Sequence, residues 1–387
     1  MLKKFKESIK KNKIESILSL VMIILVVIVM LWNNNVSKNY ENFNNENVTY
    51  VKGVVTETNN DELQKDPTDE SRYLGLQRVK GKIKEGELEG QTVEIDNYLT
   101  SSSNTYVSKG TNIVISVDNP EGADPYCLVY NYDRSLGIYG IILCFFLIMF
   151  SIGGKKGLRA CVGLVFTLFT IVYFMLPQIY LGHSPIIASI ITVVITAAVS
   201  LVLLNGLSEK TLAAIISTAL GVILVGIIFT IISFILNISG YNTDEADFMV
   251  LIAKTTNLKI SEVLFAGVLI SSLGAVMDVG MSIASAIFEL KTANVKLSVK
   301  ELFVSGLNIG KDMIGTMSNT LILAFAGSGL TTLLVLVSYG IKFNQFISSD
   351  YLAIEVARGL SSSMAIVLTV PLTSIISSII YKRHTKK

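Results

Sequence analysis

The sequence is poor in the residues on which metal and redox chemistry depend. Its 387 residues include only two histidines, three cysteines and one tryptophan. Cys127, Cys144 and Cys161 are scattered, and neither His183 nor His384 has a metal-ligand neighbour. This spacing supports neither a disulfide framework nor a zinc site. We therefore expect no metal centre, no redox function and no cofactor.

Charged residues are scarce as well. They make up 16% of the chain, against about 25% in an ordinary soluble domain, whereas hydrophobic residues make up 51%. The formal net charge is only +2, so no global field favours a nucleic-acid partner. The sequence also lacks Walker, HExxH, GxSxG and Rossmann glycine motifs. The composition excludes a soluble enzyme and predicts an integral protein of the lipid bilayer, with no catalytic residues and no motor of its own.

Long apolar runs predict an α-helical polytopic membrane protein with about eight transmembrane helices. The basic N-terminus and the apolar run 17–32 together form a predicted uncleaved signal anchor, residues 1–32, because no small-residue cleavage site follows. Seven further runs are long enough to cross roughly 30 Å of hydrocarbon. They cover residues 136–153, 157–180, 185–204, 212–238, 263–288, 314–339 and 360–381.

The distribution of lysine and arginine predicts the orientation of these spans through the positive-inside rule. The loops that face the cytoplasm in this scheme are basic, and the opposite loops are neutral or acidic. We expect a multi-pass protein of the bacterial plasma membrane, with both termini cytoplasmic and residues 33–134 extracytoplasmic. The basic residues are Lys155, Lys156, Arg159, Lys210, Lys291, Lys296, Lys300, Lys382, Arg383, Lys386 and Lys387.

Residues 33–134 have a soluble composition and alternate between polar and apolar residues. The alternation predicts five short strands, at 48–55, 77–83, 92–95, 113–117 and 127–130. A small all-β, OB-like barrel accounts for this pattern, because closure removes the sheet edges. Its tyrosines are not interleaved with a basic run, which favours a structural or protein-contact module over oligonucleotide or sugar binding. We expect the charged segment 61–72 to be a solvated loop.

The sharpest functional signal is Asp278, in the sixth predicted span. It lies about 16 Å from Glu289 along a helix, close to the expected bilayer midplane. A carboxylate there costs about 2.5–3.5 kcal/mol, so it should face protein or water. Small and polar residues recur around it at spacings of three and four and share one helix face. They are Ser271, Gly274, Ser282, Ser285 and Glu289.

The seventh predicted span begins with a second polar stripe at the same spacing, formed by Ser305, Asn308, Asp312, Gly315 and Asn319. We expect the two stripes to pair, with Asn319 as a partner of Asp278 and with Asp312 at a different depth. Gly327 and Gly329 permit close helix approach or a local break in the span. Glu355 and Arg358, at the outer end of the last predicted span, are expected to form a local ion pair.

Three interpretations of these stripes remain open. In the first, Asp278 titrates or binds a cation in a hydrated cavity, and the coupling candidates are Asp278, Asp312, Asn319, Asn308, Ser282 and Glu289. In the second, Asp278 only locks helix packing, and Gly274, Ser271, Ser285 and Gly315 supply close contact. In the third, Asp278 and Asp312 form an intramembrane aspartyl hydrolase dyad, although residues 309–312 read Ile-Gly-Lys-Asp instead of Gly-x-Gly-Asp.

Three segments carry a family resemblance. Residues 204–215 read LNGLSEKTLAAI, residues 274–285 read GAVMDVGMSIAS, and residues 305–324 read SGLNIGKDMIGTMSNTLILA. On these segments the chain resembles the YibE/YibF family of bacterial membrane proteins, and its soluble domain makes it similar to the longer, YibE-type member. The resemblance implies a seven-helix membrane domain over residues 135–387. We expect a homo-oligomer or a hetero-complex with a shorter YibF-like subunit.

A fainter similarity to the SecD/SecF membrane proteins rests on the order of an Asp-containing Gly/Met/Ser span and a following span with Asp, Asn and Thr. That similarity implies proton coupling through transmembrane acids. Our leading hypothesis is an ion- or proton-coupled transporter or export-associated permease, with no assigned transported species. The alternatives are a non-transporting scaffold whose outer β domain recruits a protein partner, and the intramembrane hydrolase.

Overall fold

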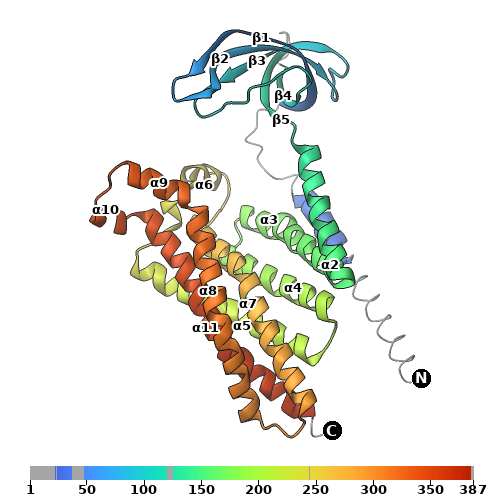
Figure 1. Ribbon diagram of the computed structural model, residues 1–387, viewed down its shortest axis with the longest axis vertical. Coiled ribbons are helices and arrows are strands. Elements are labelled where there is room, and N and C mark those ends of the chain that lie inside the picture. The colour runs from blue at the N-terminus through green and yellow to red at the C-terminus, as the bar shows by residue number, and fades with distance from the viewer. Residues whose placement is uncertain (1–21, 23, 37–47, 120–124, 244, 385–387) are drawn as a thin grey trace, which may run out of the picture. The chain divides into compact units, whose positions relative to one another are not determined.

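The computed structural model describes residues 22, 24–36, 48–119, 125–243 and 245–384 (Figure 1). The chain divides into two compact units. One is Tyr40–Ile148, and the other combines Met1–Asn39 with Met149–Lys387. The predicted first span, 17–32, lies partly outside the described residues. Residues 24–32 of it belong to the apolar helix Ile24–Val36.

The β unit is a closed barrel of five strands, and the five predicted strands are confirmed. The barrel order is β1-β2-β3-β5-β4, with β1 paired to β4. All neighbours are antiparallel except β3 and β5, which are parallel. Alternate apolar side chains from these strands fill the interior. The strands are β1 (Val48–Asp66), β2 (Asp69–Ile83), β3 (Thr92–Leu99), β4 (Asn112–Asp118) and β5 (Tyr126–Tyr132).

The prediction of a solvated loop over residues 61–72 is wrong. Strands β1 and β2 continue through this segment and pair there, for example Leu63 with Gly75 and Lys65 with Tyr73. Most of its side chains are exposed, so the two strands form a ribbon with little buried area. A ribbon of this kind has no apolar alternation, and the sequence pattern therefore resembles that of a loop.

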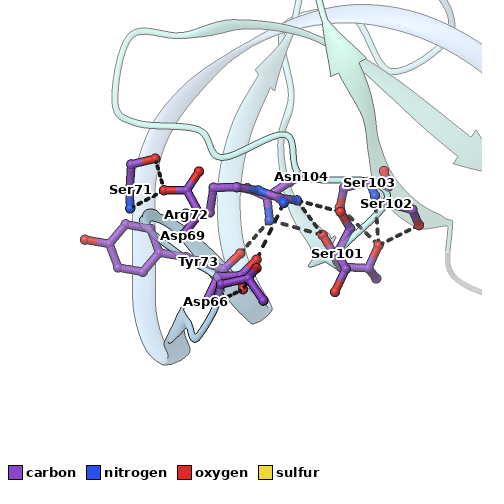
Figure 2. Close-up of polar contacts among 11 residues, drawn as sticks. Asp66, Asp69, Ser71, Arg72, Tyr73, Ser101, Ser102, Ser103 and Asn104 are labelled. Atoms are coloured by element: carbon purple, nitrogen blue, oxygen red, sulfur yellow. Dashed lines mark hydrogen bonds and ion pairs between the residues drawn. The ribbon is translucent and has the colours of Figure 1, made fainter. Parts of the chain in front are cut away.

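A polar cluster fixes the end of this ribbon to the chain that follows β3 (Figure 2). The Arg72 guanidinium donates to the carbonyl oxygens of Ser101, at 2.7 Å, and Thr100, at 3.3 Å. It also lies 3.5 Å from a carboxylate oxygen of Asp66, which is 3% exposed. The Asn104 amide donates to the carbonyl of Tyr73 at 2.6 Å. These polar contacts therefore stabilise a ribbon that has no hydrophobic core of its own.

A second polar network lies inside the barrel. Gln77 and Asn97 are buried, and the Asn97 amide donates to Gln77 Oε1 at 2.9 Å. Gln77 Nε2 donates to Asn60 Oδ1 and to the carbonyl of Val107, each at 2.8 Å. The Val107 amide in turn donates to Gln77 Oε1 at 3.2 Å. Through these hydrogen bonds Gln77 connects β1, β2, β3 and the segment before β4. Both polar atoms of its side chain have partners within the barrel.

The helical segment after the barrel contains two of the predicted spans. Helix α2 (Ser135–Thr170), the π-helical turn η2 (Ile171–Met175) and α3 (Leu176–Tyr180) follow one another, and together they form one candidate span of 46 residues. The backbone is non-helical at Gly154, with φ +54°, a conformation that glycine adopts without a Cβ penalty. The predicted spans 136–153 and 157–180 lie on either side of this break.

Six helices or helix pairs satisfy the length and hydropathy of a membrane span among the described residues. Besides Ser135–Tyr180 they are α4 (Pro185–Asn205), α5 (Glu209–Ile235), α7 (Ile260–Ala293), the pair α8 (Val299–Ser328) and α9 (Leu330–Ser338), and Asp350–Tyr381 of α11 (Asp350–His384). The short elements are η3 (Gly240–Asn242), α6 (Ala246–Ala253) and α10 (Phe343–Ile347). The chain is therefore a helical protein of the membrane type. The described residues contain fewer separate candidate spans than the eight that the sequence predicts.

The bounds of the last two predicted spans need correction. The run 314–339 is the second part of α8 together with α9, and α8 begins earlier, at Val299. The capping box of Ser298 and Glu301 starts this helix, and polar residues in its first half conceal it from a hydropathy search. Of the two alternatives for Gly327 and Gly329, close helix approach or a local break, the structure shows the break at Gly329, where α8 and α9 are bent by 55°. Helix α11 begins at Asp350, ahead of the predicted 360.

Small residues allow the helices to pack closely around α7, which contacts α4, α5, α8 and α11. A Cβ at Gly221 of α5 would meet Val276 of α7 and Thr369 of α11, so bulk is excluded there. Buried hydroxyls are mostly satisfied within their own helix, as in Ser217 to Ala213 O at 2.7 Å. Figure 1 shows α7, α8 and α11 alongside one another.

Candidate functional site

Helix α7 separates its apolar residues from its polar ones. Val276, Val279, Ile283 and Ile287 are fully buried against the neighbouring helices. On the opposite face, the predicted stripe reaches the surface of the chain. Ser271, Gly274, Asp278, Ser282 and Glu289 are exposed, and Ser285 is half-buried. The periodicity thus predicted a real helix face, which points away from the protein interior.

Helix α8 is divided in the same way. Gly306 and Gly310 lie on its buried face, where an added Cβ would meet Ser374 and Val370 of α11. The predicted polar residues Asn308, Asp312, Gly315 and Asn319 are exposed, and Ser305 is half-buried. Lys311 lies beside them, with its Nζ 3.5 Å from Asn308 Oδ1.

The contacts between α7 and α8 show how the two stripes are aligned along the helix axes. A Cβ at Gly306 would approach Ile287, and one at Gly310 would approach Ile283, which defines an antiparallel register. Asp278 is about 15 residues, or about 22 Å, from the end of α7. Asp312 is about 13 residues, or about 20 Å, from the start of α8. The expectation that the two carboxylates differ in depth is therefore wrong, because they lie within about one helical turn of each other.

The two stripes nevertheless do not converge within one chain. Asp278 lies about 140° around α7 from Ile283 and about 180° from Ile287, the residues that face α8. Across the described part of the chain, no hydrogen bond or ion pair joins Asp278 to Asn319 or to Asp312. The expected pairing of the stripes is absent because each helix buries the opposite face.

The glycines show which helix faces pack against other helices of the same chain. An added Cβ at Gly274 or Gly315 meets nothing within 4 Å, so neither residue mediates a helix contact here. Gly306 and Gly310, four residues apart, are the glycines at the α8 contact, and sequence reasoning did not assign them this role. Their four-residue spacing was the available signal. The packing role of Gly274 and Gly315 stays a prediction, for a contact outside this chain.

The other stripe residues form no bond with Asp278 or Asp312 among the described residues. Ser271 Oγ donates to its own helix, to Val268 O at 3.1 Å. Glu289 lies nearer the α7–α8 turn, which Lys291 closes by donating to the carbonyls of Val295 and Leu297. Among the described residues, no group of three or more His, Cys, Asp or Glu side chains is placed to hold a metal ion.

Comparison with known proteins places this surface within a family. The family described as YibE/F-like protein matches residues 141–383, which include all of α4 to α9 and nearly all of α11. The chain belongs to the YibE/F-like family. Both polar stripes lie inside the region that the YibE/F-like match covers, whereas the β-barrel lies before it. No curated protein and no solved structure matches the chain.

Proposed function

We propose that this YibE/F-like protein is an ion- or proton-coupled transporter or export-associated permease of the bacterial plasma membrane, with Asp278 as the coupling carboxylate. One observation carries the proposal. Asp278 and Asp312 lie at nearly the same height on two helices of candidate membrane spans, and both are exposed without a partner in the described chain. Hydrocarbon contact costs about 2.5–3.5 kcal/mol for such a group, so water or another protein must cover it.

The same surface supports an oligomer. A second copy of the chain, or a shorter YibF-like subunit, supplies the cover in our proposal. Gly274 and Gly315, with open space around them, let another helix approach closely. The carboxylates then line a cavity between subunits, where a change of charge is accommodated by water.

We propose no enzymatic activity. An aspartyl dyad requires two carboxylates about 3 Å apart that share a proton. In this chain the faces that carry Asp278 and Asp312 point away from the α7–α8 contact.

The coupling proposal is tested by Asp278→Asn in the full chain, reconstituted in liposomes with the shorter subunit where one exists. The asparagine keeps the volume and a hydrogen-bonding amide, but it cannot change charge. Currents evoked by pH or sodium jumps should fall at least about tenfold, a loss equivalent to about 1.4 kcal/mol. Asp247→Asn, the same substitution at an exposed position of α6 outside both stripes, is the matched control and should leave the currents unchanged. Equal currents from wild type and Asp278→Asn at equal expression would sink the proposal.

For topology, we propose eight spans, with both termini in the cytoplasm and the barrel outside. The support is the Gly154 break, which separates two arms of sufficient length, and the basic loops. In a background without native cysteines, cysteines at Asn60 and Glu245 should react with an impermeant thiol reagent added outside intact cells. Cysteines at Lys156 and Lys296 should not react, and labelling of Lys156 would overturn the orientation.

A second candidate function, a scaffold, is favoured by the barrel. Its connectivity, with a parallel closure of β3 on β5, supports an OB-like barrel. Tyr50, Tyr98, Tyr126 and Tyr130 are exposed on it, and tyrosine is enriched at protein interfaces. Tyr126 donates to Asp96 at 3.3 Å, and its hydrogen bond with Tyr98 together with partial burial raises the pKa of Tyr126 to about 12. Deletion of residues 33–134 should abolish a scaffold's role but leave ion-evoked currents in part.

A further inference from the structure

The break between α8 and α9 is held in place by α11. Gly329 has no room for a side chain, because an added Cβ would collide with the Tyr351 hydroxyl. That hydroxyl donates to the carbonyl of Gly329 at 2.9 Å. The bend of 55° is therefore stabilised by a specific contact between two segments that are far apart in the sequence. Broken helices of this kind commonly border binding sites in membrane proteins.

A cavity of about 240 Å³ lies beside the break. Its walls come from the last turns of α8, from α9 and from the first half of α11. Phe325, Leu333, Leu352 and Leu360 make the lining mostly apolar. Among the lining residues, Glu355 is the one that carries a charge.

The Glu355 carboxylate is only half satisfied. Its Oε1 accepts a hydrogen bond from Arg358 Nη1 at 3.0 Å, which confirms the predicted ion pair. Its Oε2 is buried and has no hydrogen-bond partner in the described chain. A buried carboxylate oxygen without a donor is costly, so the site is incomplete without a group that donates to Oε2.

The free carboxylate oxygen decides the charge of the missing group. Glu355 is the charged residue of the lining, and its Oε2 has no donor in the described chain. The cavity therefore favours a cation that can donate a hydrogen bond. A metal ion is a poor fit, because hard cations require several oxygen ligands and this lining offers one carboxylate.

We infer that this cavity binds an organic ammonium ion with an aliphatic or aromatic body. The ammonium group donates to Glu355 Oε2, and the body lies against Phe325, Leu333 and Leu352. Arg358 holds the other carboxylate oxygen and so fixes the orientation of the acceptor. This site is separate from the α7–α8 stripes and does not depend on the proposed coupling role of Asp278.

The test uses the full chain in lipid nanodiscs, with phenylbutylamine as the probe and phenylbutanol as its neutral counterpart. Equilibrium dialysis measures binding after subtraction of protein-free discs, because both probes dissolve in lipid. We expect saturable binding of the amine. Loss of one charge-assisted hydrogen bond predicts that the alcohol binds the wild type at least about tenfold more weakly. Glu355→Gln should weaken binding of the amine by a similar factor, whereas Glu245→Gln, at an exposed position outside the cavity, should leave binding of the amine unchanged.

A second variant keeps the inference testable if Glu355→Gln disturbs folding. Leu333→Trp fills the cavity and leaves the ion pair intact, so it should abolish saturable binding of both probes. Equal binding of amine and alcohol would overturn the inference and indicate an apolar site for a lipid chain. Binding no greater than in protein-free discs, or unchanged binding by both variants, would also overturn it.

Discussion

The β-barrel and the α7–α8 hairpin place their polar side chains in opposite environments. In the barrel, Gln77 and Asn97 are buried, and neighbouring groups of the same chain bond to them. On the hairpin, Asp278 and Asp312 lie at the surface without a described partner. A buried network with all its partners specifies one structure, whereas an exposed carboxylate on an apolar helix requires a partner from elsewhere. The presence of hydrogen-bond partners within the chain thus separates polar groups that stabilise the fold from those available for function.

The largest effect should come from Gln77→Leu in the barrel. The substitution removes the side-chain partner of the Val107 carbonyl and of the Val107 amide. It also removes one of the two acceptors of the Asn97 side-chain amide, which keeps the Thr105 carbonyl. At roughly 1–3 kcal/mol for each unsatisfied buried group, the barrel should lose about 3 kcal/mol or more of unfolding free energy. The measurement is urea-dependent labelling of the buried Cys127 thiol in full-length protein with Cys144 and Cys161 replaced by serine.

Gln64→Leu is the matched control for this change. Gln64 is an exposed glutamine on β1, so the same substitution there should change stability by no more than about 0.5 kcal/mol. If the two variants unfold at the same urea concentration, the interior network does not stabilise the barrel, and the contrast with the hairpin disappears.

An intermediate effect is expected on α8 itself, where Gly310→Leu and Gly315→Leu differ only in position. Gly310 faces Val370 without room for a Cβ, whereas Gly315 faces open space. Gly310→Leu should destabilise the helical unit by about 1–3 kcal/mol through overpacking. Gly315→Leu should leave the thermal midpoint of the single chain unchanged and weaken subunit association instead. Thermal unfolding and size-exclusion chromatography of the two variants distinguish these results, and a lower midpoint for Gly315→Leu would place that face inside the chain.

The smallest expected effect is the pH dependence of the β1–β2 ribbon. The Thr68 hydroxyl and amide donate to Asp66, and they hold the pKa of this carboxyl below its usual value. This stabilisation is present above the unfolded pKa of about 3.9 and is lost as the pH falls through the lower folded pKa. Asp66→Asn should therefore accelerate hydrogen exchange of the ribbon at pH 7, but the difference from wild type should shrink near pH 3.

Hydrogen-exchange mass spectrometry on full-length protein measures this difference at each pH against wild type under the same conditions. Glu70→Gln, at an exposed position of the same ribbon, is the control and should show no such difference. A gap between Asp66→Asn and wild type that persists at pH 3 would mean that the Thr68 contacts do not depend on the charge of Asp66.

Local patterns predicted much of this molecule. The period of two located all five strands, and hydropathy located the apolar helices. Two glycines indicated a close approach or a break, and the break lies at Gly329. A spacing of three and four placed Asp278 and Ser282 on one helix face. Each of these features depends on residues that are close in sequence, and a single sequence reports such features well.

Features that depend on contacts between segments far apart in the sequence were not predictable in the same way. Helical spacing defines a polar face of α7 but not what covers it, so the expected contact with Asn319 was wrong for one chain. The cavity combines residues 322–333 with residues 351–360, which no local pattern connects. The ribbon over residues 61–72 was missed because a two-stranded extension buries no face and leaves no periodic signal.

The junction between the barrel and α2 has a mechanical consequence. Lys52 on β1 donates to Ser135, the first residue of α2, at 3.0 Å and lies 3.8 Å from Asp133. Asp133 in turn accepts from the hydroxyl and the amide of Ser135. Tension applied along α2 is therefore shared between β5, which leads into the helix, and β1, which is clamped to its first turn. The first turn of α2 is therefore connected to the barrel twice, by the chain from β5 and by the Lys52 contacts from β1.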